Sequence, residues 1–235
     1  MFNPKPNIQA LPLYDDQVCY VIDEVFLHPE AWVLEAIKHR ERFIEAPSNA
    51  YPGIELQMPD DINQGIINYF NSYLNRRFGI RRIKSSFSRL SMVTRKPEQL
   101  MPRQWICHRD GVSVPPNERM LASVIYLYKQ PSLGGTSFYR AKQNAQQTAQ
   151  LIHDSSVLQA EQFTAKYGIL PGFMTESNHW FEKIGSVDAR WNRMIVYDGM
   201  VFHSGDIIRP ELMTDNPETG RLSLNGFFSA RRNLA

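Results

Sequence analysis

A histidine and an aspartate near the middle of the chain have the spacing of two metal ligands. In the stretch QWICHRDG, residues 104–111, a single residue separates His108 from Asp110. Side chains two residues apart point to the same face of a β-strand. If a strand runs through this stretch, His108 and Asp110 point together, and Cys107 and Arg109 point away.

A second histidine would complete a known kind of metal site. Two imidazoles and one carboxylate can occupy one face of a six-coordinate ion and leave three positions open, as in the facial triad of non-haem iron(II) oxygenases. His203 is the best candidate, because it ends the apolar run of RMIVYDGMVFHSG, where polar residues begin. A histidine buried in the core is the alternative interpretation of His203.

The other histidines are weaker candidates. His28 and His39 lie at an expected helix, and His153 lies in a polar segment, so structural or solvent-facing roles account for them. His179, in the sequence SNHW, stays open as a residue at the entrance to a substrate site.

An arginine and a serine alternate near the end of the chain, in GRLSLNGFF at residues 220–228. Arg221 and Ser223 share one face of the expected strand, and Leu222 and Leu224 share the other. A buried charge without a partner is costly, so an arginine inside a barrel indicates a bound anion. Its guanidinium suits a carboxylate, with Ser223 as a further donor. The alternative is Arg221 at the rim of the strand, paired with an acidic residue.

The elements that position these residues follow from the sequence pattern. Residues 17–26 are strand-like, 28–43 predict a helix with Pro29 at its first position, and 60–79 predict an amphipathic helix that ends at Gly79. Residues 51–59 are rich in turn formers. Residues 17–85 therefore form a strand with supporting helices.

Strand patterns dominate from about Ser85. The Asp198-Gly199 pair between two apolar arms predicts a hairpin, and the polar residues 141–168 predict a helical insertion. Helices followed by antiparallel strands indicate one α+β, mainly β domain over residues 1–235, with helices against a β-sandwich or barrel. The strand patterns occupy residues 85–95, 121–130, 133–140, 193–205 and 220–232.

Together these motifs resemble the iron(II)- and 2-oxoglutarate-dependent oxygenases, in their prolyl-hydroxylase-like branch. The family pattern is His-x-Asp, a strand with Tyr-Leu, a Gly-Gly turn before a strand, a distal His, and Arg-x-Ser. The resemblance covers about residues 86–231. The corresponding stretches, in the family's order, are HRD (108–110), SVIYLYK (123–129), LGGTSFYR (133–140), RMIVYDGMVFHSG (193–205) and GRLSLNGFF (220–228).

The resemblance implies a double-stranded β-helix, or jelly roll, buttressed by the N-terminal helices. It implies that iron(II) is bound and that 2-oxoglutarate and O2 are used to hydroxylate an unactivated C–H bond. The substrate could be a peptidyl residue, an amino acid or a small metabolite. The implied iron ligands are His108, Asp110 and His203, and the implied residues for 2-oxoglutarate are Arg221, Ser223 and Tyr126.

One departure from the family concerns the arginine. Arg221 lies farther after His203 than in the closest relatives, so we interpret DIIRPELMTDNPET as a loop insertion. Arg209 lies at the more usual distance, but it precedes Pro210 and no x-Ser strand pattern follows, so we favour Arg221. If Arg209 holds the cosubstrate, Arg221 is structural. A cupin-like metalloprotein and a non-catalytic jelly-roll module, neither of which uses 2-oxoglutarate, are the rival classes.

Composition favours a globular protein. A net charge of +2 gives no reason to expect a nucleic acid or a membrane as partner, and Cys19 and Cys107 lack the spacing of a zinc or redox motif. The first residues lack the pattern of a signal peptide, so we expect a soluble, cytoplasmic protein. Candidates for the substrate entrance are residues 51–53, residues 95–104, Trp180 and Trp191, although core packing is the favoured role of both tryptophans.

Overall fold

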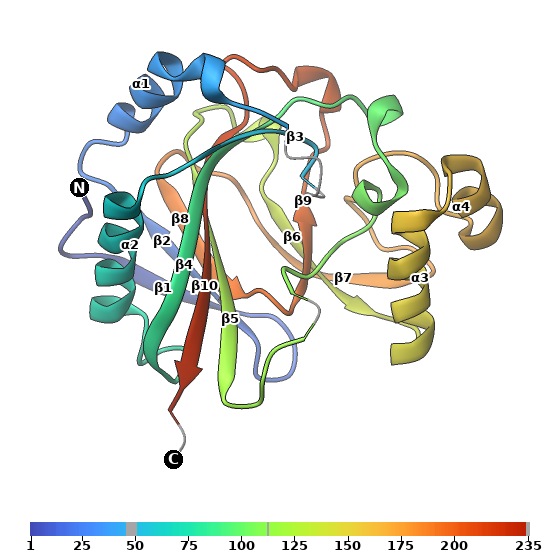
Figure 1. Ribbon diagram of the computed structural model, residues 1–235, viewed down its shortest axis with the longest axis horizontal. Helices are drawn as coiled ribbons and strands as arrows, with labels where there is room; N and C mark the ends of the chain where they lie inside the picture. The colour runs from blue at the N-terminus through green and yellow to red at the C-terminus, as the bar shows by residue number, and fades with distance from the viewer. Residues whose placement is uncertain (46–50, 112, 234–235) are drawn as a thin grey trace.

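Two antiparallel sheets organise the computed structural model, which describes residues 1–45, 51–111 and 113–233 (Figure 1). Within these residues the larger sheet consists, in spatial order, of β1 (Asn7–Pro12), β2 (Val18–Asp23), β8 (Arg193–Asp198), β5 (Glu118–Tyr126), β10 (Leu222–Arg232), β4 (Ile80–Val93) and β3 (Gly53–Gln57). The smaller sheet consists of β7 (Phe181–Val187), β6 (Thr136–Ala141) and β9 (Phe202–Gly205). The expectation of a mainly β, α+β protein with antiparallel sheets is confirmed.

Helices lie on the outer sides of both sheets (Figure 1). The α-helices are α1 (Glu30–Lys38) and α2 (Asp60–Tyr73), which lie against the large sheet, and α3 (Ala145–Val157) and α4 (Ala160–Tyr167), which lie beside the small sheet. Short 3-10 turns occupy Arg40–Arg42, Pro97–Gln99, Pro102–Gln104, Pro131–Leu133 and Pro210–Leu212. Helices α1 and α2 lie within the residues for which the sequence predicts N-terminal helices, and α3 and α4 lie within the expected insertion. No helix in the described ranges is both long enough and apolar enough to span a membrane.

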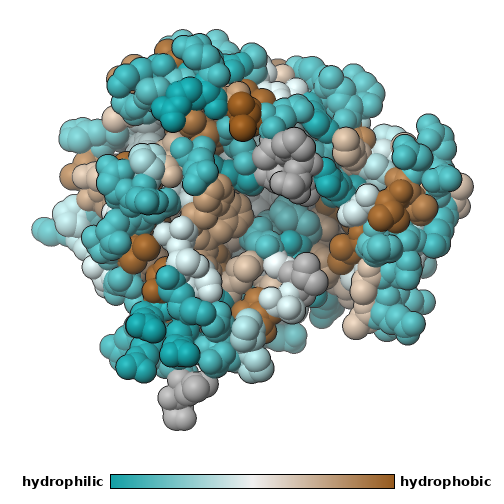
Figure 2. All heavy atoms as spheres, viewed as in Figure 1, coloured by the Kyte–Doolittle hydropathy of each residue, from teal (hydrophilic) through white to brown (hydrophobic). Residues whose placement is uncertain are grey.

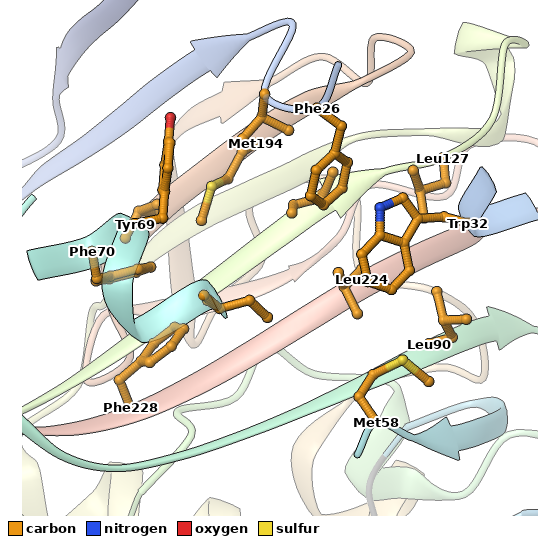
Figure 3. Close-up of a cluster of buried hydrophobic side chains, with 14 of the residues drawn as sticks. Phe26, Trp32, Met58, Tyr69, Phe70, Leu90, Leu127, Met194, Leu224 and Phe228 are labelled. Carbon is orange, nitrogen blue, oxygen red and sulfur yellow. The ribbon is translucent and has the colours of Figure 1, made fainter. Parts of the chain in front are cut away.

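Strand alternation gives the large sheet one apolar face and one polar face. On β10, Leu224 and Phe228 point to α1 and α2, where Phe70 lies with its ring centroid 4.1 Å from that of Phe228 (Figure 3). Fully burying an apolar side chain contributes about 1.5–3 kcal/mol, so this layer holds the helices to the sheet. Ser223 and Asn225 alternate with these residues and line a cavity on the opposite face.

A separate apolar cluster anchors the stretch that carries His108 and Asp110. Trp105 and Cys107 are buried outside the small sheet, against Phe202 of β9 and Phe163 of α4. His108 and Asp110 line the cavity, whereas Trp105 and Cys107 do not. The stretch does not form the expected strand, since His108 makes only an isolated bridge, to His203.

The expected hairpin at Asp198 and Gly199 is wrong. A turn does form, in which the amide of Val201 donates to the carbonyl of Asp198 at 2.9 Å. However, β8 pairs with β2 and β5 in the large sheet, and β9 pairs with β6 in the small sheet. The turn therefore carries the chain from one sheet to the other. The carbonyl of Gly199 accepts a hydrogen bond from the amide of Asp110, and the amide of Gly199 donates to the carbonyl of Met120.

Two strands lie where the sequence predicted none. Residues 51–59 contain the edge strand β3, which pairs with β4, and the Pro-rich beginning of the chain contains the edge strand β1. Both tolerate prolines next to or within them because an edge strand leaves one row of backbone groups unpaired. Tertiary pairing thus overrides the local turn signals.

Candidate metal centre

The structure brings His108, Asp110 and His203 together. One ligand atom from each lies within 4.8 Å of the others. Nε2 of His203 is 3.5 Å from Oδ1 of Asp110, and Nε2 of His108 is 3.8 Å from the same oxygen. Two imidazoles and one carboxylate therefore converge on one point.

Backbone hydrogen bonds fix each of these residues. His108 and His203 bridge each other, and the amide of Asp110 donates to the carbonyl of Gly199 at 2.8 Å. The carbonyl of Val201 lies 2.9 Å from Nδ1 of His203. A carbonyl there selects the tautomer that carries its proton on Nδ1, which leaves the Nε2 lone pair directed to the centre.

Burial and the neighbouring charges set the protonation of the three groups in the metal-free chain. Burial raises the pKa of Asp110, but the two histidines outweigh it and hold that pKa below 3.8. Burial lowers the pKa of His203, and the adjacent Asp110 carboxylate outweighs it, so the net pKa lies above 6.5. His108 lines the cavity, and 48% of its side chain is accessible. Desolvation of its ring, together with the adjacent His203, lowers the pKa of His108 to about 4.

The donor set fits a divalent metal ion. Oδ2 of Asp110 is buried and has no hydrogen-bond partner within the described part of the chain, and a buried carboxylate oxygen calls for a partner. A metal ion would supply one. Imidazole and carboxylate ligands in this combination suit iron(II) with open positions for other ligands.

The three residues share a cavity of about 610 Å³ with Arg221 and Ser223. Figure 2 shows a hollow near the centre of the visible face, with hydrophilic atoms at its bottom. Arg221 is 4% exposed; its Nε donates to the carbonyl of Leu133 at 3.1 Å, and its Nη2 donates to that of Gly135 at 2.8 Å. Arg209 instead lies on the surface, paired with Glu211.

Tyr126 lies one layer behind the cavity wall. Its side chain is fully buried, and its hydroxyl donates to Oγ1 of Thr136 at 2.9 Å. Thr136 itself lines the cavity. Any influence of Tyr126 on a ligand would therefore pass through Thr136.

The remaining sequence candidates are dispersed. His153 and His28 are exposed, His39 lies 3.3 Å from Glu35 on α1, and His179 is exposed beside Gln143. Tyr51 and Gln104 line the cavity, so both segments proposed for the substrate entrance reach it. Trp180 packs against Tyr167, and Trp191 lies beside Lys129.

The sequence did not single out Arg89, Glu55 and Asn225, which also line the cavity. Asn225 continues the alternation that places Arg221 and Ser223 on one face, so this alternation could have identified it. Arg89 is its partner on β4. Glu55 could not have been found in the same way, because its strand was not predicted.

Comparisons with known proteins extend this description. Residues 4–228 match a protein family described as "Family of unknown function (DUF6445)". No curated protein matches the sequence.

The chain is also similar to several solved structures. The α-ketoglutarate-dependent carbocyclase SnoK from nogalamycin biosynthesis is 13% identical with a TM-score of 0.52, over 93% of this chain and 81% of its own. HygX from Streptomyces hygroscopicus, solved with nickel and 2-oxoglutarate, is 11% identical with a TM-score of 0.51, over 92% of this chain and 84% of its own. A prolyl-4-hydroxylase of Pseudomonas putida is 15% identical with a TM-score of 0.46, over 92% of this chain and 93% of its own. At such identities the likeness to SnoK and HygX concerns the fold.

Proposed function

The chain belongs to the DUF6445 family, whose function is unknown, and from its own residues we propose that it is a non-haem iron(II)- and 2-oxoglutarate-dependent dioxygenase. The proposed reaction is hydroxylation of an unactivated C–H bond in a peptidyl residue, an amino acid or a small metabolite. The observation that carries the proposal is the convergence of His108, Asp110 and His203 in the cavity that also contains a buried arginine.

His108, Asp110 and His203 would hold the iron. When bound, iron(II) with open positions supplies the activation of O2 that C–H hydroxylation requires. The protein contributes placement: the carbonyl of Val201 orients His203, and the side chain of Asp110 is buried, with 6% of it exposed. The lowered pKa of Asp110 keeps it ionised, as a ligand must be.

Arg221 and Ser223 would bind the distal carboxylate of 2-oxoglutarate. The guanidinium is held by backbone carbonyls and lies 5.7 Å above the ring of Tyr128. Within residues 1–45, 51–111 and 113–233, no acidic side chain forms an ion pair with Arg221. A buried arginine that is oriented by neutral groups is suited to an anionic ligand. Tyr126 would act through Thr136, which its hydroxyl fixes at the cavity wall.

The arrangement of the sheets supports a double-stranded β-helix of the prolyl-hydroxylase-like kind. The chain passes from β8 in the large sheet to β9 in the small sheet, as a jelly roll requires. The fold likeness to SnoK and HygX, which are named as an α-ketoglutarate-dependent enzyme and a 2-oxoglutarate complex, supports the same assignment.

An anaerobic titration tests the proposal. Purified metal-free protein receives iron(II) and then 2-oxoglutarate, and the weak visible charge-transfer band of the chelated keto acid is recorded. We expect the band in the wild type, its loss in His203→Ala, and a 2-oxoglutarate affinity at least about tenfold weaker in Arg221→Ala, since charged hydrogen bonds contribute about 1.5–3 kcal/mol each. Arg209→Ala is the matched control and should behave as the wild type.

The two rival classes give a different result. A cupin-like metalloprotein or a non-catalytic jelly roll would bind iron without forming the band when 2-oxoglutarate is added. That outcome would refute the oxygenase assignment.

A further inference from the structure

A second polar group lies in the same cavity, on the face of the large sheet. Arg89 of β4 and Asn225 of β10 are cross-strand partners, and both line the cavity. The side chain of Arg89 is 12% exposed, and Asn225 is 7% exposed. Neither residue belongs to the sets proposed to bind iron or 2-oxoglutarate.

Each of these residues carries a buried polar atom that is without a hydrogen-bond partner in the described ranges. The atoms are Nε of Arg89, a donor, and Oδ1 of Asn225, an acceptor. Two other such atoms in the cavity are accounted for by the proposed function: Oδ2 of Asp110 by the metal ion, and Oγ of Ser223 by the 2-oxoglutarate carboxylate. Buried polar groups are normally paired, so the donor and the acceptor that remain indicate a second ligand.

Both side chains also make contacts that hold them in place. A terminal nitrogen of Arg89 forms an ion pair with Glu55, and its guanidinium lies 5.3 Å from the ring centroid of Tyr51 and 5.2 Å from that of Phe227. Nδ2 of Asn225 donates to Oγ of Ser91 at 3.2 Å. These contacts fix the directions in which Nε and Oδ1 point.

The charge of this group selects the chemistry of its ligand. Glu55 balances the charge of Arg89, and Asn225 is neutral, so these three side chains together carry no net charge. A carboxylate offers only acceptors and would leave Oδ1 unpaired, whereas an ammonium group offers only donors and would leave Nε unpaired. An amide group offers an acceptor and a donor on two separate atoms, whereas a hydroxyl offers both on a single oxygen.

The group also lies next to the metal centre. Phe227, two residues beyond Asn225 on the same face, pairs with Ala122 of β5, and Ala122 pairs with Tyr197 of β8. The ring centroid of Tyr197 is 4.7 Å from that of His203. A molecule bound between Arg89 and Asn225 would therefore reach the side of the cavity where the three ligand residues converge.

We propose that Arg89 and Asn225 bind an amide group of the primary substrate. Nε of Arg89 donates to the amide carbonyl, and Oδ1 of Asn225 accepts from the amide N–H. The substrate is accordingly a carboxamide or a peptide-bonded compound. The role of this ligand as the molecule that is oxidised rests on the proposed function, but its binding at these two residues does not.

Three small probes, the first two of nearly equal shape, test the amide site in the metal-free protein. They are N-methylacetamide, methyl acetate, which lacks the N–H donor, and acetate, which carries a charge. Ligand-detected saturation-transfer NMR gives the concentration at which each probe saturates. We expect N-methylacetamide to bind about fivefold or more tightly than methyl acetate, because the ester leaves Oδ1 of Asn225 without a donor.

Substitutions assign the preference to the two residues. Asn225→Leu should bring the affinity of N-methylacetamide down to that of methyl acetate. Glu55→Gln should shift the preference toward acetate, because it leaves the charge of Arg89 unbalanced. Asn68→Leu, on the exposed side of α2, is the matched control and should keep the wild-type preference. Glutamine and the peptide N-acetylglycylglycine N-methylamide then distinguish a free carboxamide from a peptide.

Several results would overturn the proposal: no saturable binding of N-methylacetamide, equal affinity for amide and ester, a preference that survives in Asn225→Leu, or a preference of the wild type for acetate. The 2-oxoglutarate band, measured separately on the iron-loaded protein, should be retained in Asn225→Leu. An amide preference without the band would refute the oxygenase and leave the amide site standing. The band without an amide preference would refute the amide site and leave the oxygenase assignment standing.

Discussion

His108 and His203 form an isolated antiparallel bridge in which they exchange both backbone hydrogen bonds. The amide of His108 donates to the carbonyl of His203 at 3.0 Å, and the amide of His203 donates to that of His108 at 2.9 Å. Their rings lie on the same side, with centroids 4.4 Å apart. The position of both imidazoles is therefore set by main-chain atoms that a substitution by alanine retains.

Replacing either histidine should accordingly remove metal binding without undoing the fold. For His108→Ala and His203→Ala we expect the affinity for iron(II) or cobalt(II) to fall more than about 100-fold, since the loss of even an outer-sphere partner costs about 10–100-fold. The metal-free unfolding temperature should change little for His108→Ala. Metal titration and thermal unfolding measure the two effects, with His153→Ala on the surface of α3 as the control. Retained metal affinity in both variants would contradict the site.

Gly199 should affect metal binding because it leaves room for the side chain of Asp110. A Cβ atom at Gly199 would lie 2.8 Å from Oδ2 of Asp110 and 3.2 Å from its Cβ. Gly199→Ala should push the carboxylate aside and lower metal affinity by about tenfold, comparable with the loss of an outer-sphere partner. Gly185→Ala is the matched control, because the nearest atom to its Cβ would be 3.6 Å away. Equal metal affinities of the two variants would show that Asp110 does not need its present position.

The sequence predicted which residues converge in the cavity more readily than it predicted which elements hold them there. The spacing of His108 and Asp110 predicted that both side chains point to the same side. Both do line the cavity, but they lie on an irregular stretch, not on a strand, and the buried side chains of Trp105 and Cys107 anchor it. The apolar arms around Asp198 and Gly199 carried the strand signal but not the information that each arm pairs in a different sheet. Pairing between distant strands decides such matters, and local pattern does not encode it.

Arg221 should contribute to stability as well as to cosubstrate binding. Its guanidinium donates to the carbonyls of Leu133 and Gly135, which shape the loop before β6. Arg221→Ala leaves these buried acceptors without their donor, a cost of about 1–3 kcal/mol in the free energy of unfolding. Denaturant unfolding of the metal-free protein measures this cost. A wild-type stability for Arg221→Ala would show that water replaces the lost donor.

Tyr126 should act only indirectly. Tyr126→Phe removes the hydrogen bond to Thr136 and should cost about 0.5–1.5 kcal/mol of stability. It should weaken 2-oxoglutarate binding less than Arg221→Ala does, because Thr136 and not Tyr126 lines the cavity. Parallel titrations of the two variants compare the effects. An equal or larger loss in Tyr126→Phe would mean that the tyrosine hydroxyl contacts the cosubstrate itself.

The pH dependence of metal binding should follow His203. Between about pH 5 and 9 in the metal-free chain, Asp110 is ionised and His108 is neutral, since their pKa values lie below 3.8 and at about 4. The pKa of His203 lies above 6.5, because Asp110 outweighs the effect of burial. A metal ion must displace the His203 proton, so metal affinity should rise by up to about tenfold per pH unit until the pH passes that pKa.

The stability of the metal-free chain should change in the opposite direction over the same range. A group whose folded-state pKa is raised stabilises the fold fully below its unfolded pKa, here about 6.5, and this contribution is lost as pH rises through the folded value. Thermal unfolding in the presence of a chelator should therefore show a decline above about pH 6.5 that is missing in His203→Gln. If wild type and variant keep a constant difference across this range, His203 does not carry the proton. Asp110 then does not raise the pKa of His203 in solution.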